Sequence, residues 1–264
     1  MRFDSKIIWI TGASSGIGKE LAIQLARLGA TLILTSSNTT LLEELKNQLN
    51  GAKVHVLPFN LLDLDGLNAL VEKALSLEGT IDYVIQSAGI SQRAEAKDTS
   101  MEVYKKLMDI NYFAPVAITQ ALLPHFKKHN SGNITVISSI AGLIGFPLRS
   151  GYAASKHAIK GYLETLQCEL HKTNITISIV YPGRINTNIS KNALLGDGQQ
   201  FGNTDANNEV GMEVDVCAQK IIKGLFLNKK SVIIVKAERL LFWLWWFIPS
   251  LYYNIAHAKG LQNK

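Results

Sequence analysis

Two ionisable side chains, Tyr152 and Lys156, stand four residues apart and could carry out proton chemistry together. In a helix, positions i and i+4 lie on one face, so the phenol and the ammonium would be neighbours. A positive charge beside a phenol stabilises the phenolate, which predicts a Tyr152 pKa lowered toward neutrality. Such a phenol could protonate a carbonyl oxygen or take a proton from an alcohol. The spacing alone is weak evidence, because tyrosine and lysine meet at it by chance in many helices.

Ser139 is a candidate partner for the same substrate oxygen. It lies thirteen residues before Tyr152, at the end of the apolar run 134–137, which predicts a buried strand. A hydroxyl placed there can hydrogen-bond the oxygen on which charge develops. For the neighbouring Ser138 we expect a structural role.

A glycine-rich turn near the N-terminus could hold a phosphate group. The apolar run 6–11 predicts a strand covered on both faces, and the helical pattern after the turn ends at Gly29. Between them, the glycines at Gly12, Gly16 and Gly18 follow the spacing G-x-x-x-G-x-G, which departs from the usual dinucleotide spacing G-x-G-x-x-G. Glycines let the backbone approach a pyrophosphate, and the helix N-terminus presents free N–H groups to it. A glycine turn without a ligand is the alternative.

Strands and helices alternate along the rest of the chain. The sequence predicts strands at 31–35, 53–57, 82–86, 134–137, 176–180 and 231–235, and helices at 39–48, 63–76, 100–129, 152–171 and 214–227. We expect Pro115 to break or kink the long helix, and the Gly- and Asn-rich segment 190–211 to form a mobile loop. The alternation predicts an α/β fold, a single-domain doubly wound (Rossmann-type) parallel β-sheet with helices on both faces, spanning residues 1–236.

Several motifs, in this order, resemble the short-chain dehydrogenase/reductase family. They are Thr11-Gly12-Ala13-Ser14-Ser15-Gly16-Ile17-Gly18, Ser87-Ala88-Gly89, Asn111, Ser138-Ser139, Tyr152-x-x-x-Lys156 and Pro182-Gly183, and the resemblance covers about residues 5–236. It implies a catalytic tetrad of Asn111, Ser139, Tyr152 and Lys156. Tyr152 would be the acid or base and Ser139 would polarise the substrate oxygen. Lys156 would hold the nicotinamide ribose and lower the tyrosine pKa, while Asn111 would anchor a water that relays protons. A locally satisfied polar residue is the alternative for Asn111.

The resemblance also implies a nicotinamide cofactor and the residues that bind it. These would be Gly12, Ser14, Ser15, Gly16, Ile17, Gly18, Ser36, Ser37, Asn60, Leu61, Ala88, Gly89, Tyr152, Lys156, Pro182, Gly183, Ile185 and Thr187, the last at the carboxamide.

The cofactor preference depends on the end of the second strand. It reads Thr35-Ser36-Ser37-Asn38, without the acidic residue that binds the ribose diol of NAD and repels a 2′-phosphate. This favours NADP, with NAD the less favoured choice. The arginine that the family's NADP users often carry near Ser37 is absent, which leaves hydroxyls and Lys19 for the phosphate. Two further departures from the family pattern are Asn60, in place of an aspartate, and Gln86-Ser87, in place of Asn-Asn.

Composition excludes several classes of function. The net charge is +6, but the lysines are scattered, with no basic run before residue 229, so we expect no nucleic-acid binding. The two cysteines, Cys168 and Cys217, fall in predicted helices and read as reduced, packed thiols. No signal peptide is expected, which favours a cytoplasmic location. His125 and His129 have helical spacing for a metal but no third ligand in view, so no metal site is expected.

The tail 237–264 differs in kind from the rest of the chain. From Leu240 to Tyr253 it is apolar and aromatic, and it holds three of the four tryptophans. The run is too short, and too interrupted by Pro249-Ser250, to span a bilayer. We expect it to lie at a membrane surface as a peripheral or monotopic element in an inner leaflet, because tryptophan and tyrosine favour the headgroup boundary. Packing over the substrate cleft or a subunit interface is the alternative.

Together these features predict an NADP-dependent oxidoreductase that transfers a hydride between nicotinamide and a carbonyl or secondary alcohol. The tail resembles that of membrane-associated family members, which favours a lipophilic substrate such as a lipid, a steroid or a retinoid-like molecule. The alternative is a catalytically silent NAD(P)-binding scaffold or regulatory protein at a membrane. The resemblance also implies a homo-oligomer, a dimer or tetramer, formed through the helices around 112–129 and 152–171.

Overall fold

The computed structural model describes residues 1–203, 211–236 and 238–262, with side chains as far as residue 258. A seven-stranded sheet lies at its centre, in the order β3-β2-β1-β4-β5-β6-β7, and every neighbouring pair is parallel. The strands are β1 (Ile7–Thr11), β2 (Thr31–Thr35), β3 (Val54–Val56), β4 (Tyr83–Gln86), β5 (Gly132–Ile137), β6 (Ile175–Pro182) and β7 (Ser231–Ile234). The order reverses direction between β1 and β4, which is the point where doubly wound sheets open a crevice for ligands. The predicted fold class is confirmed.

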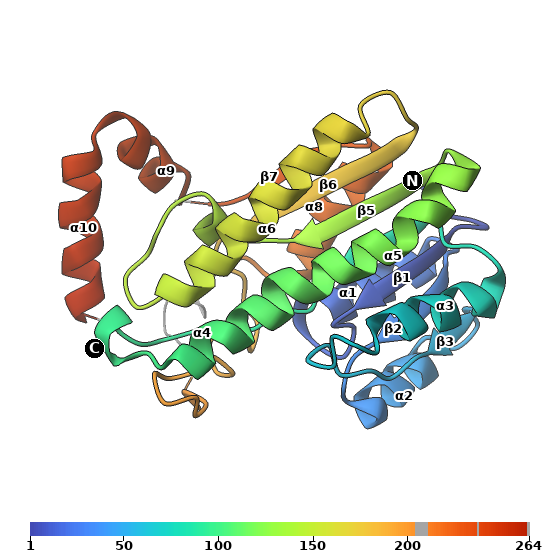
Figure 1. The fold of residues 1–264 in the computed structure, drawn as a ribbon, viewed down its shortest axis with the longest axis horizontal. Coiled ribbons are helices and arrows are strands. Elements are labelled where there is room, and N and C mark those ends of the chain that lie inside the picture. Colours follow the sequence, from blue (N-terminus) through green and yellow to red (C-terminus); the bar gives the residue numbers. More distant parts are fainter. Residues whose placement is uncertain (204–210, 237, 263–264) are drawn as a thin grey trace.

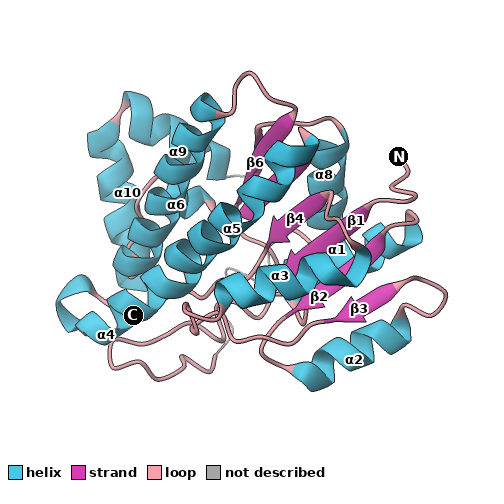
Figure 2. Ribbon diagram, turned by 45° about the vertical axis from the view of Figure 1, so that its right-hand side comes forward, coloured by secondary structure: helices cyan, strands magenta, loops and turns pink. Residues whose placement is uncertain are grey.

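Helices cover both faces of the sheet (Figure 2). They are α1 (Gly16–Arg27), α2 (Thr39–Gln48), α3 (Leu67–Glu78), α4 (Met101–Met108), α5 (Ala114–His129), α6 (Ser150–Glu169), α8 (Val214–Phe226), α9 (Glu238–Phe247) and α10 (Pro249–Gln262).

The core has two layers because successive side chains of a strand point to opposite faces. Ile8 and Ile10 of β1 pack with α1, α2 and α8 in one cluster, whereas Trp9 packs with α3, α5 and α6 in the other. All three are fully buried, and the Trp9 indole donates a hydrogen bond to Thr35 Oγ1 at 2.9 Å. A strand that is apolar on both faces is therefore explained by its central place in the sheet.

The long helix predicted over 100–129 is two helices joined by a π-helical turn, Asp109–Phe113. Pro115 follows this turn closely, and because Phe113 and Ala114 are helical, its missing N–H removes a donor that would otherwise face the carbonyls of the turn. The interruption thus precedes the proline, and it carries Asn111, which is 1% exposed. π-Helical turns are often found at functional sites.

Three smaller expectations are corrected. The helix predicted from residue 63 begins at Leu67, because Asp63 Oδ1 accepts the N–H of Gly66 and closes a turn before it. Cys168 is exposed rather than packed, whereas Cys217 is buried, and burial raises the pKa of its thiol to about 12. Of the predicted loop 190–211, residues 204–210 lie outside the described part; Ser190–Leu194 lies against Ser91–Arg93 through the backbone bonds Leu194 N to Ser91 O and Arg93 N to Leu194 O.

The tail forms a helical hairpin, α9–α10, beside the carboxyl end of the sheet (Figure 1). It packs on the segment 140–146 through a small apolar cluster that contains Ile140, Ile144 and Tyr252. Among the described residues, no helix has the length and apolar character required to cross a bilayer. The inner face of the tail therefore packs against protein, as in the alternative expectation.

Candidate active site

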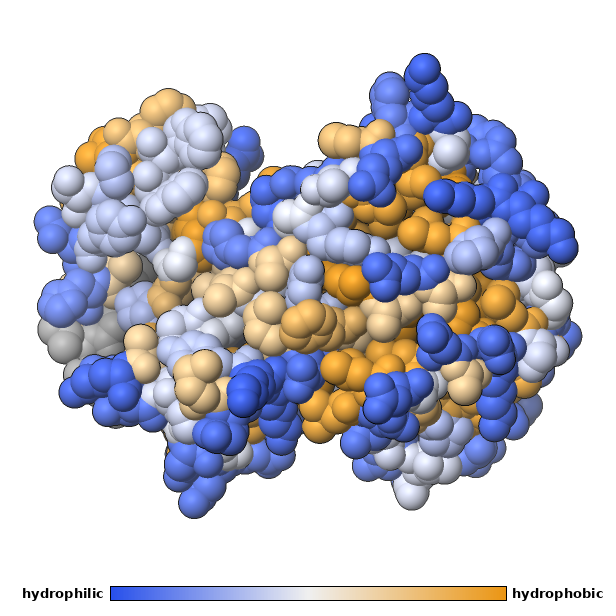
Figure 3. All heavy atoms as spheres, viewed as in Figure 1, coloured by the Kyte–Doolittle hydropathy of each residue, from blue (hydrophilic) through white to orange (hydrophobic). Residues whose placement is uncertain are grey.

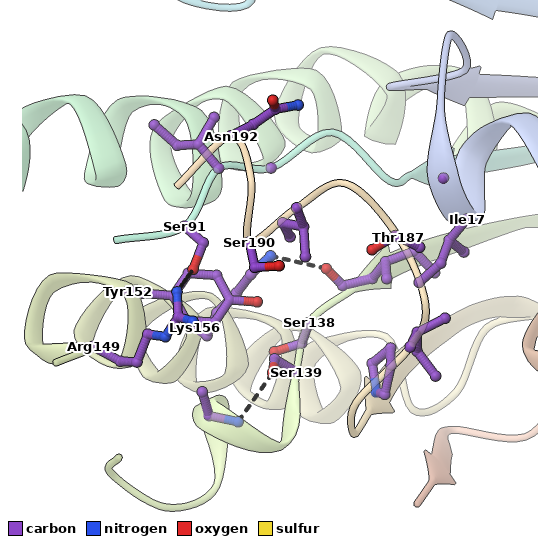
Figure 4. Close-up of a pocket in the computed structure, with 18 of the residues that line it drawn as sticks. Ile17, Ser91, Ser138, Ser139, Arg149, Tyr152, Lys156, Thr187, Ser190 and Asn192 are labelled. Carbon is purple, nitrogen blue, oxygen red and sulfur yellow. Dashed lines mark hydrogen bonds between the residues drawn. The ribbon is translucent and has the colours of Figure 1, made fainter. Parts of the chain in front are cut away.

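A cavity of about 580 Å³ opens at the carboxyl ends of the strands, where the strand order reverses. Eighteen of the twenty residues predicted for cofactor and catalysis line it, from the glycine turn through to the segment after β6 (Figure 4). These are Gly12, Ser14, Ser15, Gly16, Ile17, Ser36, Ser37, Asn60, Leu61, Ala88, Gly89, Ser139, Tyr152, Lys156, Pro182, Gly183, Ile185 and Thr187. Gly18 and Asn111 lie behind the wall.

Tyr152 and Ser139 face each other at one end of this cavity. Ser139 follows β5, and its Oγ accepts the N–H of Ala141 at 3.1 Å, which fixes the hydroxyl at the strand end. Tyr152 lies in the first turn of α6, and the Ser139 side chain is close enough to act on its hydroxyl as a hydrogen-bond partner that lowers the phenol pKa. The two hydroxyls that could share one substrate oxygen therefore lie together in the structure.

The electrostatics of Tyr152 differ from the expectation. Burial raises the pKa of its phenol above the usual value, while the hydrogen bond from Ser139 and the positive charge of Arg149 lower it. The Lys156 ammonium instead donates to the carbonyl of Ile137 at 2.9 Å, and lies 5.8 Å from the centre of the Tyr152 ring. The predicted lowering of the phenol pKa toward neutrality by Lys156 is therefore wrong for this structure. Burial also lowers the pKa of Lys156, to about 8.

Asn111 lies behind the cavity wall and is fully engaged with protein. Its Oδ1 accepts the N–H of Ile90 at 3.0 Å, and its Nδ2 donates to Ile90 O at 2.9 Å and to Ser155 Oγ at 3.0 Å. The side chain thus clamps the segment after β4 to α6. Both N–H groups of the amide are therefore taken by protein, and a water could be held by this side chain only through the second lone pair of Oδ1.

The glycine turn satisfies the steric demands of a dinucleotide. Gly12 has φ +69°, and a Cβ there would lie 2.6 Å from the Ala88 backbone. A Cβ on Gly18 would lie 2.3 Å from Gly12 O, so this glycine allows the turn to close against the start of α1. The first turn of α1 has no acidic residue, and its free N–H groups point out of the helix end. The residues present therefore fit a cofactor pyrophosphate.

The cavity end at β2 is lined by Ser36, Ser37, Asn60 and Leu61. The Ser36 hydroxyl accepts the N–H of Asn38 at 3.1 Å, and Asn60 Oδ1 accepts the N–H of Leu62 at 3.1 Å. Among the described residues that line the cavity, Glu238 is the one carboxylate, and it belongs to the tail rather than to this end. A 2′-phosphate on an adenosine ribose would therefore meet hydroxyls and no acidic group here.

The segment after β6 closes the other side of the cavity. Thr187 approaches the glycine turn, since a Cβ on Gly16 would lie 3.5 Å from its methyl group. Ile185 is paired with Met212 through an isolated bridge, which fixes the segment against the start of α8. Thr187 is thus placed where it could contact a ring bound between the glycine turn and Tyr152.

Several residues of the cavity were not expected from the sequence. Arg149, one helical turn before Tyr152, donates from Nη1 to Ser91 Oγ at 2.7 Å and to Gln92 O at 2.6 Å. Arg93 lies over the Phe201 ring, 4.5 Å from its centre, and Glu238 accepts the N–H of Arg184 at 3.1 Å. The sequence could have indicated Arg149, because it lies three residues before Tyr152 and would share its helix face. Arg93 and Glu238 reach the cavity only through tertiary contacts.

The described residues contain no group of three His, Cys, Asp or Glu side chains that could hold a metal. His125 bonds Thr80 through its ring Nε2 at 3.2 Å, which gives it a structural role. The Ser139 and Tyr152 hydroxyls, which line the cavity, can take part in proton transfer at a substrate oxygen.

Comparison with known proteins gives the same result for the family. Residues 6–197 match the family described as short chain dehydrogenase. Dehydrogenase/reductase SDR family member 7B of Xenopus laevis is 36% identical over 97% of this chain and 82% of the relative. Dehydrogenase/reductase SDR family member 7 of Homo sapiens is 34% identical over 97% of this chain and 78% of the relative.

Solved structures share the fold. A short-chain dehydrogenase/reductase from Burkholderia phymatum, in complex with NAD, superposes with a TM-score of 0.82 and 21% identity, covering 92% of this chain and 94% of the other. A short-chain dehydrogenase from Sphingobium yanoikuyae, in complex with NADPH, gives 0.76 and 27%, covering 89% and 91%. Both nicotinamide cofactors therefore occur among proteins of this fold.

Proposed function

Because this chain belongs to the short-chain dehydrogenase/reductase family, we propose that it is an NADP-dependent oxidoreductase acting on a lipophilic carbonyl or secondary alcohol. Membership makes it a short-chain oxidoreductase; the NADP preference and the substrate class are our proposals. The observation that carries the proposal is the contact between the Tyr152 and Ser139 hydroxyls inside the cavity that begins at the glycine turn.

The side chains divide the proton chemistry between them. The Tyr152 hydroxyl gives a proton to a carbonyl oxygen in reduction, or takes one from an alcohol in oxidation. Ser139 holds the same oxygen and stabilises the charge that develops on it. The buried Lys156 ammonium keeps a positive charge close to the phenol ring and to the end of β5. When bound, the nicotinamide supplies or accepts the hydride.

The preference for NADP is supported by the chemistry at the end of β2. Ser36 and Ser37 offer hydroxyls, and no Asp or Glu among the described residues lines that end of the cavity. An acidic residue there would repel a 2′-phosphate, so its absence removes the penalty against NADP.

A lipophilic substrate is supported by the apolar part of the cavity wall. Apolar side chains from two segments form it, namely Ile140, Phe146 and Leu148 before α6, with Leu241, Ile255 and Ala256 from the tail. A wall of this kind favours an apolar substrate, while the hydroxyls at Tyr152 fix its oxygen.

The test measures oxidation of NADPH and of NADH, by absorbance, with carbonyl compounds of increasing chain length. We expect a higher kcat/KM with NADPH and with the longer, more apolar carbonyls. Tyr152→Phe should lower turnover by about 10²-fold or more, since it removes the proton donor. Its affinity for NADPH, measured by nucleotide fluorescence, should stay close to wild type. Equal turnover of Tyr152→Phe and wild type would refute the catalytic role, and binding without turnover of any substrate would favour the silent scaffold.

We also propose that the protein lies at the inner face of a membrane, as a peripheral or monotopic protein, and that it forms a homo-oligomer. The aromatic tail supports the first proposal and family membership the second. Light scattering after size exclusion measures the oligomer; a monomer at micromolar concentration would refute the second proposal.

A further inference from the structure

The hairpin α9–α10 has one face in the catalytic cavity and another in solvent. On the inner side, Leu241, Tyr252, Ile255 and Ala256 line the cavity that also contains Tyr152. The outer side carries large apolar side chains that nothing in the described chain covers. These are Leu240, Trp243, Trp246, Phe247, Ile248, Leu251 and Tyr253, and we call them the outer patch.

The hairpin is tied to both sides of the cavity mouth. At its start, the Glu238 carboxylate accepts the N–H of Arg184, at 3.1 Å, and that of Lys236, at 3.0 Å. In α10, the Tyr252 hydroxyl donates to Gly145 O, in the segment that leads to α6. Tyr252 is 2% exposed, so the tie is inside the protein. The hairpin is therefore a part of the cavity wall and not a loose extension.

The outer patch is strongly exposed for its residue types. Trp246 is 65% exposed, Phe247 64% and Leu240 65%, and the rings of Trp243 and Phe247 stack with centres 5.2 Å apart. Figure 3 shows the hairpin as a lobe that carries hydrophobic atoms at its top and is mostly of intermediate hydropathy elsewhere on the visible face. Large apolar side chains that are exposed in this number on one element mark an interaction surface.

Residue type and charge select the partner. Tryptophan and tyrosine favour the boundary between headgroups and acyl chains. The tail 237–264 contains three cations, Arg239, Lys259 and Lys264, and one carboxylate, Glu238, which is bound to backbone N–H groups. Such a segment complements an anionic bilayer, whereas two copies facing each other through it would bring like charges together.

We propose that an anionic lipid surface docks on the outer patch, and that the hairpin passes lipophilic substrate from this surface into the cavity. The substrate route rests on the proposed function, because it needs an apolar substrate at Tyr152. The docking does not rest on it. The physical reason for the route is that α9 and α10 line the cavity on one side and carry the outer patch on the other. A docked bilayer would therefore lie only about one helix diameter from the cavity. A substrate dissolved in lipid would then reach Tyr152 without crossing water.

The first experiment measures docking by flotation of the full chain with vesicles of phosphatidylcholine alone, or with phosphatidylglycerol added. We expect the wild type to float with the anionic vesicles, and brominated lipid to quench its tryptophan fluorescence. The double variant Trp246→Ser/Phe247→Ser should lose flotation by at least tenfold. The control is Leu41→Ser, because Leu41 is 40% exposed and its helix, α2, lies at the end of the molecule opposite the hairpin (Figure 1). Recovery of wild type in the unbound fraction, or equal flotation of the double variant, would overturn the docking proposal.

The second experiment measures the route. A long-chain ketone held in anionic vesicles and a short water-soluble ketone are compared as substrates, with NADPH. We expect the double variant to lose turnover of the vesicle-held ketone by about the factor lost in flotation, and to keep turnover of the soluble ketone. Equal loss on both ketones would overturn the route.

Two further outcomes are separated by these measurements. If no ketone or alcohol is turned over by wild type, the proposed function fails, while flotation still decides the docking. If the double variant converts a wild-type dimer into a monomer, and wild type does not float, the outer patch binds a second copy and the lipid proposal is overturned.

Discussion

The Lys156 ammonium donates to the carbonyl of Ile137 at 2.9 Å, which places a buried positive charge at the last residue of β5. The next two residues, Ser138 and Ser139, lead directly to the Tyr152 hydroxyl. This contact explains why Lys156 can stay buried, at 4% exposure, although desolvation disfavours its charge. It also makes the lysine a part of the folded core, so the free-energy cost of burying its charge depends on pH.

That cost gives the first prediction. Burial lowers the pKa of Lys156 from 10.5 in an exposed lysine to about 8. Between these two values the unfolded chain binds more protons than the folded one, so the free energy of unfolding should rise with pH. The contribution should grow by up to about 3 kcal/mol between pH 8 and 10.5, and stay constant below pH 8. Urea unfolding of wild type and Lys156→Met over this range measures it as the difference between the two slopes. Parallel pH profiles would contradict the prediction.

A second prediction concerns Ser139. Its hydrogen bond lowers the pKa of Tyr152 against the raising effect of burial, so Ser139→Ala should raise that pKa further. In alcohol oxidation, which requires the phenolate, the rising limb of the kcat profile should move to higher pH. At fixed pH the loss of one donor should cost about 10²-fold in kcat. Ser139→Thr keeps the hydroxyl and should recover part of both effects, whereas an unmoved limb in Ser139→Ala would rule out this role.

Loss of the Arg149 charge should also raise the pKa of Tyr152, although Arg149 acts on the phenol by its charge and not by a hydrogen bond. It lowers the pKa of Tyr152 and is fixed by Ser91 and Gln92. Arg149→Gln should therefore move the limb to higher pH by less than Ser139→Ala does, and Arg149→Lys should restore it. The limb is read from the same kcat profiles of alcohol oxidation, with the Michaelis constant for NADP⁺ as a control that should not change.

The glycine turn gives a prediction with a matched control. Gly18→Ala would place a methyl group 2.3 Å from Gly12 O, which the backbone must move to avoid. We expect loss of NADPH binding by at least about tenfold and a destabilisation of about 1–3 kcal/mol, as in overpacked cores. Gly161→Ala in α6 meets nothing within 4 Å and should stabilise by up to about 1 kcal/mol. Nucleotide titration and thermal unfolding of both variants measure these effects; normal binding by Gly18→Ala would contradict the steric argument.

Asn111 should matter for structure more than for a proton relay. Asn111→Leu removes the partners of Ile90 N, Ile90 O and Ser155 Oγ, and should destabilise by about 2–4 kcal/mol. Urea unfolding measures this loss. A variant as stable as wild type, but inactive, would instead favour the relay that the resemblance implies.

Parts of the fold follow from local pattern. The run 6–11 is apolar at every position, and the structure places Ile8, Trp9 and Ile10 in a central strand where both faces are buried. The long helix was less predictable. The interruption is a π-helical turn that lies just before Pro115 and brings Asn111 to Ile90. A contact across 21 residues of sequence has no signature in local periodicity.

The amino-acid sequence by itself determined the order of strands and helices, the glycine turn and the pairing of Tyr152 with Lys156 on one helix, because these depend on periodicity and on neighbours in the chain. Only the tertiary structure decided what surrounds each charge. In it the Lys156 ammonium donates to the Ile137 carbonyl, Arg149 lies near the phenol, and one face of the tail lines the cavity. The physical reason is that pKa values and burial depend on desolvation and on groups far apart in sequence, which meet only when the chain has folded.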